Sequence, residues 1–344
     1  MINRGTTLVL VLLAVLTTAI AVWVVAQDPG LAQASRNDEP VFADLRGQID
    51  DLTIIRLASD EAEFAMTKDE GDTWLVASAH NYPADPIKVT QLFRQLIDLA
   101  YGEAKTQKPE HFHRLGLQDV GSEGSNATRI TLESEGGDKI VDALFGDPAR
   151  VGGIGRYFRA PDSEQTWRVN GSVSLDTAPS SWLDREILTL GEDMARTVTF
   201  SAPSGETVTA FRDDAESDLV LSFDGDEELA IDMGAVAGLK GILEGVRFDS
   251  VVPRANDGWT EAVHQLEVST FDGRRVEAEI MSRDGGYWLR VTMTATGEAT
   301  EEVKQRASAF NRRHGEWTYQ IPSYLGQRFT RGQEDFLQPE PPES

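Results

Sequence analysis

The chain has 344 residues, of which 40% are hydrophobic and 26% are charged. This composition is that of a folded protein, and the length suits about two domains of ordinary size, each with its own core. The net charge is −25, from 32 basic and 57 acidic residues, which opposes binding to nucleic acid phosphates. The absence of cysteine excludes disulfides, a thiolate nucleophile and a thiolate zinc site.

An uncharged, mostly apolar run follows Arg4 and extends from Gly5 to Ala26. It has about the ~20 residues that a helix needs to cross a bilayer. We therefore predict a transmembrane anchor over residues 1–27 of a single-pass inner-membrane protein, with the bulk of the chain in the periplasm. A cleaved signal peptide is the alternative, because Ala32-Gln33-Ala34 has the form of a cleavage site. The apolar run nevertheless exceeds the ~7–15 residues of a signal-peptide core.

A tether and a first folded unit follow the anchor. Residues 28–43 contain Pro, Gly, Ser, Asn and Asp without apolar periodicity, which is typical of a tether. Residues 44–190 are predicted to form the first unit. Short runs of Thr, Val, Ile and aromatic residues between polar turns predict strands at 54–57, 63–67, 73–76, 129–132, 140–145, 155–159 and 166–169. A short helix is expected at about 180–188.

The clearest helix start in the chain is at Asp85. Pro86 has no N–H to lose at a first helical position, and the Asp85 carboxylate can accept from the free amides of the first turn. Between there and about Ala100, apolar residues recur at helical spacing, at Val89, Leu92, Phe93, Leu96 and Leu99. This apolar side predicts a helix that packs on a sheet.

The helix pattern recurs later in the chain at a constant offset of 147 (232 − 85 = 147). Asp85, Val89, Leu92, Leu96 and Leu99 match Asp232, Val236, Leu239, Leu243 and Val246. Flanking strands agree loosely, since Ile54 matches Val198 at 144 (198 − 54 = 144) and Trp167 matches Trp317 at 150 (317 − 167 = 150). We therefore predict a duplicated second unit over residues 191–330.

The second unit carries two further features. Its helix is rich in glycine, and an additional helix is expected at 300–313. Residues 331–344 are predicted to be a disordered acidic, proline-rich tail. The sequence thus predicts an α+β protein of two similar tandem units after a transmembrane helix, each unit a mainly antiparallel sheet with one long packed helix.

Three motifs could hold an ion or a phosphate, and each has a simpler interpretation. His111 and His113 alternate beside Glu110, but two imidazoles do not make a metal site, and a solvated connector is favoured. Residues 152–155 are glycine-rich but lack the strand and helix that frame a phosphate loop, which favours a hairpin turn. Residues 224–228 are acidic but lack the ligand spacing of a calcium loop.

The sequence also has no nucleophile elbow of the Gly-x-Ser-x-Gly type. We accordingly predict no catalytic, cofactor-binding or metal-binding residues. A pair of carboxylates for glycan hydrolysis stays open as an alternative, because the separation of such a pair depends on the fold.

Several turns, caps and aromatic residues together resemble a known family. They are Trp74 before Tyr82-Pro83-Ala84-Asp85, Leu115-Gly116-Leu117, Gly146 before Tyr157-Phe158-Arg159, and Asn311-Arg312-Arg313 before Trp317 to Pro322. This set resembles the bacterial domain of unknown function numbered 4340. The resemblance implies a fold more than a chemistry, with structural motif residues Trp74, Tyr82, Pro83, Asp85, Gly116, Tyr157, Arg159, Asp232, Trp317 and Pro322.

The resemblance also implies one N-terminal membrane segment and, for some members, an association with an ABC-type export system. We therefore expect a non-catalytic periplasmic interaction module, anchored in the inner membrane, with an exporter or an envelope-assembly protein as its partner. A periplasmic ligand-binding protein or a carboxylate-dependent envelope hydrolase is the alternative.

Overall fold

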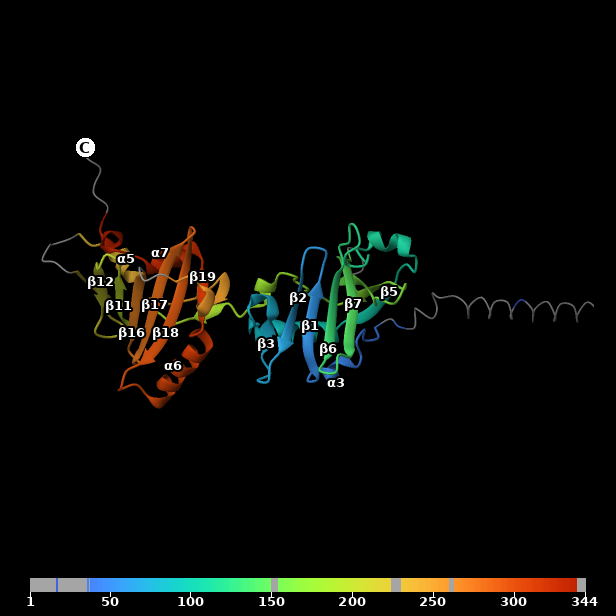
Figure 1. Cartoon of the computed structure of the whole chain (residues 1–344), viewed down its shortest axis with the longest axis horizontal. Helices are drawn as coiled ribbons and strands as arrows, with labels where there is room; N and C mark the ends of the chain where they lie inside the picture. Colours follow the sequence, from blue (N-terminus) through green and yellow to red (C-terminus); the bar gives the residue numbers. More distant parts are fainter. Residues whose placement is uncertain are drawn as a thin grey trace, which may run out of the picture. The chain divides into compact units, whose positions relative to one another are not determined.

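The computed structural model describes residues 17, 36, 38–149, 154–223, 230–259 and 263–338, and the chain divides into two compact units between Leu183 and Asp184. Both units are α+β, with mainly antiparallel sheets (Figure 1). The predicted boundary, between residues 190 and 191, lies seven residues too late (190 − 183 = 7). The reason is that strand β10, Glu186–Leu188, pairs with β14, Val246–Arg247, of the second unit.

The predicted membrane anchor lies outside the described residues, apart from Thr17. Within the described part of the chain, no helix combines the length and apolar character needed to span a bilayer. The end of the predicted tether belongs to the first unit, which corrects the expectation for residues 38–43. The Tyr101 N–H donates to Glu39 O at 2.8 Å, and Phe42 packs edge-on against Phe158.

The sheet of the first unit has nine strands in the order β4-β3-β2-β1-β6-β7-β8-β9-β5. The strands are β1 Leu52–Ala58, β2 Glu63–Lys68, β3 Trp74–Val76, β4 Tyr82–Pro83, β5 Ala100–Ala104, β6 Thr128–Ser134, β7 Lys139–Pro148, β8 Gly155–Arg159 and β9 Trp167–Asn170. All seven predicted strands are confirmed. The two that were missed, β4 and β5, flank the helix and are too short to show alternation.

Helix α4, Pro86–Ile97, begins where the sequence predicts. The Asp85 carboxylate accepts from Ile87 N at 2.9 Å and from Lys88 N at 3.4 Å, which satisfies two amides that have no partner within the helix. The apolar side of the helix is buried, and the Phe93 ring lies 6.0 Å from the Trp74 ring of β3.

The helix predicted at about 180–188 is wrong. A short 3-10 helix, η3 Pro179–Trp182, is followed by extended chain and then by β10. Leu183 forms a bridge with Ala84, and Trp182 O accepts from the Asp85 N–H at 2.7 Å. Pairing with the start of α4 therefore overrides the local helical pattern.

The main sheet of the second unit has eight strands in the order β13-β12-β11-β16-β17-β18-β19-β15. They are β11 Ala195–Ser201, β12 Thr207–Phe211, β13 Val220–Phe223, β15 Ser250–Pro253, β16 His264–Thr270, β17 Arg274–Arg283, β18 Gly286–Ala295 and β19 Trp317–Ile321. The expected additional helix is confirmed as α6, Glu301–His314, and α7, Ser323–Phe329, follows β19.

The helix predicted from Asp232 is short. Asp232 caps it by accepting from Gly234 N at 2.8 Å, but α5 covers only Met233–Ala237. Glycine at 238 and 241 weakens helix propensity by roughly 1 kcal/mol each relative to alanine, so turns replace the later helix. The matched apolar positions are nevertheless buried, at Val236, Leu239, Leu243 and Val246.

The expected disorder of residues 331–344 is wrong for the first part of that segment. A 3-10 helix, η5 Gln333–Phe336, places the Phe336 ring, which is 0% exposed, against Phe200. Phe336 O accepts from the Asp232 N–H at 2.8 Å. Burial of this one aromatic ring stabilises an otherwise polar segment. Residues 339–344 lie outside the described part.

The first prediction concerns the α4 cap. We expect Asp85→Ala to lower the free energy of unfolding of the first unit by about 0.5–2 kcal/mol, because two amides lose their acceptor. Denaturant unfolding measures this change. The control is Gln91→Ala, since Gln91 is exposed on the same helix. Equal midpoints for both variants would show that the cap contributes nothing.

A buried histidine joins α6 to the sheet of the second unit. His314 is 3% exposed, its Nδ1 lies 2.7 Å from the Tyr319 hydroxyl, and its ring lies 4.5 Å from the Phe310 ring, tilted by 42°. Burial, together with the neighbouring Arg313 charge, lowers the pKa of His314 to about 4. The folded unit therefore holds this imidazole neutral at pH values where the unfolded chain is protonated.

The second prediction follows from this pKa. The unfolded histidine binds a proton near its ordinary pKa of 6.5, but the folded one does so only near 4. The contribution of the neutral His314 to the free energy of unfolding is therefore fully present above pH 6.5. It falls by about 2–3 kcal/mol in total as the pH drops from 6.5 to 4. We expect His314→Gln to remove this part of the loss, measured as unfolding free energy at pH 7 and pH 4.5. Identical losses in both proteins would contradict the assignment.

Candidate functional site

The main sheet of the second unit has one packed face and one open face. Alternate residues of β16, β17 and β18 are buried, among them Leu266, Ala278 and Val291. The residues between them are exposed or half-buried because side chains alternate along a strand. We call this side the open face. Its outward residues on the three strands include Gln265, Glu267, Glu277, Glu279, Arg290 and Thr292.

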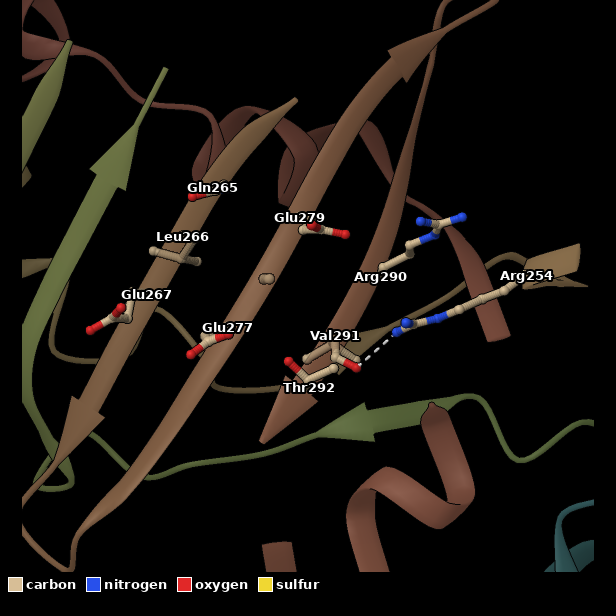
Figure 2. A pocket seen from close by; sticks show the side chains of 10 residues that line it. Arg254, Gln265, Leu266, Glu267, Glu277, Glu279, Arg290, Val291 and Thr292 are labelled. Carbon is tan, nitrogen blue, oxygen red and sulfur yellow. Dashed lines mark hydrogen bonds between the residues drawn. The ribbon is translucent and has the colours of Figure 1, made fainter. Parts of the chain in front are cut away.

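A hollow of about 380 Å³ lies over the middle of the open face, and we call it the charged hollow. Figure 2 shows Glu267 and Glu277 on one side of it and Arg254 and Arg290 on the other. The two sides come from different elements. The glutamates belong to β16 and β17, whereas Arg290 belongs to β18 and Arg254 begins the 3-10 helix η4, Arg254–Asn256.

The glutamates of the charged hollow are incompletely neutralised. Glu267 and Glu277 are direct cross-strand partners, an arrangement that places like charges side by side. Glu267 has an ion pair with Arg275 at 3.4 Å. No ion pair connects Glu277 or Glu279 to any cation in the described residues. This side of the hollow therefore keeps a negative potential.

Arg290 is neutralised by a buried carboxylate. Its Nη2 lies 2.6 Å from Asp257 Oδ2, and the Asp257 side chain is only 3% exposed. The Thr318 hydroxyl also donates to Asp257, and the guanidinium lies 4.2 Å from the Trp259 ring centre. Burial opposes ionisation of Asp257, but the hydrogen bonds from Thr318 and Arg290 outweigh it and hold the pKa of Asp257 below its ordinary value.

Arg254 has no such carboxylate. Its Nε donates to Trp317 O at 3.3 Å and its Nη2 donates to Val291 O at 3.4 Å, both long hydrogen bonds. No carboxylate of the described residues lies within ion-pair distance of it. Burial, and then the charge of Arg290, lower the pKa of Arg254. The charges of Glu279, Glu316 and Asp257 act in the opposite direction and raise it. The guanidinium is thus a half-buried cation with acidic neighbours but no directly paired carboxylate among the described residues.

A second hollow, of about 720 Å³, lies where β11 begins and where β12 and β16 end. Phe211 and Phe271 line it and are 42% and 36% exposed, and Val220, opposite Phe211 on β13, is 57% exposed. We call Phe211, Val220 and Phe271 the aromatic end. Arg212 lies 5.5 Å and Arg196 lies 6.0 Å from the Phe271 ring centre. The cations lie within the distance of cation–π interaction.

The motif residues predicted from sequence do not form one site. Gly116, Tyr157 and Arg159 lie around a small core of Phe112, Leu117, Ala127 and Leu144 in the first unit. The buried Arg159 donates to Leu117 O at 3.0 Å and pairs with Asp119. Gly116 has φ of 64°, and a Cβ there would approach Asp147 to 2.9 Å. These residues hold a connector on the sheet.

The other motif residues occupy turns and element ends. Trp74 and Tyr82-Pro83 belong to β3 and β4 beside the Asp85 cap. In the second unit, Asp232 caps α5, Trp317 begins β19 and Pro322 precedes α7. The residues of the two hollows were missed by sequence reasoning. Alternation within strands marks which side chains point outward, but not which strands become neighbours.

The weaker candidates give no site. His111 and His113 lie on a 3-10 helix, η2 Pro109–Arg114, and not on a strand. The described residues contain no group of three or more side chains suited to hold a metal ion. Of the glycine-rich segment, residues 152 and 153 lie outside the described part and Gly155 begins β8. Acidic residues 224–228 also lie outside it.

The third prediction concerns the Asp257–Arg290 pair. Removing one partner of a buried ion pair leaves the other charge uncompensated. We expect Asp257→Ala to destabilise the second unit by about 2–4 kcal/mol, somewhat less than for a fully buried pair because Arg290 is 20% exposed. Asp284→Asn, whose side chain is 93% exposed, is the control and should leave the denaturant midpoint unchanged. Similar midpoints for both variants would contradict the prediction.

Comparison with known proteins gives a match to a family model. No curated protein and no solved structure matches it. A family model described as a domain of unknown function, DUF4340, matches residues 74–257, which is more than half of the chain. This range includes parts of both units and the aspartates that cap α4 and α5. The chain therefore belongs to the DUF4340 family of domains of unknown function.

Proposed function

We propose that this protein is a non-catalytic, membrane-anchored interaction module of the periplasm, and that the aromatic end binds an envelope protein. The observation that carries the proposal is the set of exposed apolar side chains at Phe211, Val220 and Phe271, beside Arg196. Aromatic residues and arginine dominate the energy of protein interfaces. A patch of exposed apolar side chains on a chain with a net charge of −25 indicates an interaction site.

The geometry of the aromatic end also supports this role. Phe211 and Val220 are cross-strand partners on a sheet, so their side chains are held in place by backbone pairing. Arg212 is 3% exposed and donates to Ala195 O at 2.7 Å and to Glu192 O at 2.6 Å. This fixed guanidinium supports the Phe271 ring. A preorganised surface loses little side-chain entropy when a partner binds.

The location and the class of partner are part of the same proposal. The uncharged run from Gly5 to Ala26 supports a membrane anchor, and the polar residues that follow support a tether. An anchored module meets partners that are confined to the same membrane, such as an exporter or an envelope-assembly protein. Tethering raises the effective concentration of such a partner, so a modest interface is sufficient.

We further propose that the two units arose by duplication. The strand orders of the two main sheets correspond, so that β1 matches β11, β9 matches β19 and β5 matches β15. In each unit an aspartate caps the first helix after the opening run of strands, which ends at β4 in the first unit and at β13 in the second. In each, the residue before that aspartate bridges to the end of the unit, Ala84 to Leu183 and Ile231 to Leu337.

The strand registers place the matched residues differently from the sequence offsets. Leu57 faces Ile130 of β6, and Phe200 faces Leu266 of the corresponding strand β16. This gives an offset of 143 (200 − 57 = 143). Trp167 faces Phe158 as Tyr319 faces Leu289, an offset of 152 (319 − 167 = 152). Trp317 is therefore not the counterpart of Trp167 under this proposal.

The fourth prediction tests the interaction. A photo-reactive amino acid at position 271, 211 or 220 of the full chain in intact cells should crosslink one membrane protein, recovered with the chain in the inner-membrane fraction. Arg196→Ala should weaken the crosslink from position 211, because it removes a cation beside the Phe271 ring. In a purified pair we expect Phe271→Ala to weaken binding by roughly 30-fold or more, as for an interface hot spot.

Ile87 provides the matched control. It is 66% exposed and belongs to the first unit, whereas the aromatic end belongs to the second. A photo-reactive group at position 87 should not capture the same protein, and Ile87→Ala should bind it normally. Crosslinks of equal strength from positions 87 and 271 would refute the assignment of the aromatic end. Recovery of a shortened, soluble chain would refute the anchor.

A further inference from the structure

We propose that the charged hollow binds a zwitterionic ligand, an amino acid or a short peptide, with its carboxylate on Arg254 and its ammonium group on Glu277 and Glu267. This inference goes beyond the interaction module and does not depend on it. The aromatic end carries the module, whereas the charged hollow has different lining residues.

Opposite charges line opposite sides of the hollow. The negative side chains come from β16 and β17, and Arg254 reaches the hollow from the opposite side (Figure 2). A simple cation or anion would meet one favourable side and one repulsive side. A ligand with both charges is attracted by both sides, so the field of the hollow selects a zwitterion.

Arg254 has no carboxylate of the described residues within ion-pair distance, although Glu279, Glu316 and Asp257 lie near enough to act on its pKa. In the described part of the chain its guanidinium makes two long hydrogen bonds to carbonyl oxygens, which leaves donors free for a ligand. A planar guanidinium matches the two oxygens of a carboxylate, and this charge-assisted pair is strong when partly shielded from water. Arg290 differs, because Asp257 already occupies its donors.

The two facing glutamates are incompletely neutralised. Glu277 has no cation partner among the described residues, and Glu267, directly opposite, shares one arginine at 3.4 Å. An ammonium group between two such carboxylates relieves their mutual repulsion and gains hydrogen bonds from both. The backbone between them is held by the β16–β17 pairing, so the two carboxylates are presented from a rigid base.

The size of the hollow limits the ligand. A volume of about 380 Å³ lies at the lower end of the range for small-molecule sites, roughly 300–1,000 Å³. The apolar contribution of the lining is small, since its buried members are Leu266, Ala278 and Val291. Recognition therefore rests on the two charged ends of the ligand and not on a large side chain.

Isothermal titration of the purified full chain with L-alanine, dialanine and trialanine tests the proposal. At low salt we expect one of these three to bind with 1:1 stoichiometry. N-acetylation or C-amidation of that peptide should each weaken binding by about 10-fold or more, because each removes one charge-assisted contact. The substitutions Glu277→Gln and Arg254→Gln should weaken binding by a similar factor. Raised salt should weaken it further.

The controls separate this site from other effects. Glu61→Gln changes an exposed glutamate of the first unit and should bind normally. Arg254→Gln is a valid test of binding if its unfolding midpoint equals that of the unmodified chain. If that midpoint is lower, Glu277→Gln provides the test, because Glu277 has no ion pair among the described residues. Absence of binding by all three probes, or equal binding of the blocked and free peptides, would overturn the proposal. Phe271→Ala should leave peptide binding unchanged, so failure here is distinguishable from failure of the interaction module.

Discussion

In each unit, a hydrogen bond at the start of the helix helps to join the helix to the end of the unit. The N–H of the capping aspartate, Asp85 or Asp232, donates to a carbonyl near the end of the unit, Trp182 or Phe336. The carboxylate of the same residue holds the first helical turn. The aspartate thus connects the helix, the closing segment and a buried aromatic ring at one point. Loss of this connection would expose backbone groups and apolar surface together.

The open face is a consequence of how the core is built in the second unit. Buried side chains of β16, β17 and β18 pack on one side of the sheet, so every second residue must point the other way. Part of that other side is covered by the segment around Asp257 and Trp259, which neutralises Arg290. The remainder holds the charged hollow and the aromatic end. Core packing on one side therefore leaves the opposite side available for binding.

The two units differ in how the charges on their sheets are paired. In the first unit, Arg56 pairs with Glu133 and Arg129 pairs with Asp142, so charges on that sheet are matched. In the second unit, Glu277 and Glu279 have no such partners among the described residues. Ion pairs on a surface contribute little to stability, and their charges attract few ligands. Charges without a partner are available to bind a ligand. This contrast favours the second unit as the functional part.

The sequence by itself determined the strands of the first unit, the Asp85 and Asp232 caps and the family, because periodicity, capping chemistry and turn residues are local properties. Only the tertiary structure decided two further features. It ordered residues 333–336 through burial of Phe336, and it placed Arg254 across the hollow from Glu277. The physical reason is that each depends on contacts between residues far apart in the chain, which no local pattern contains.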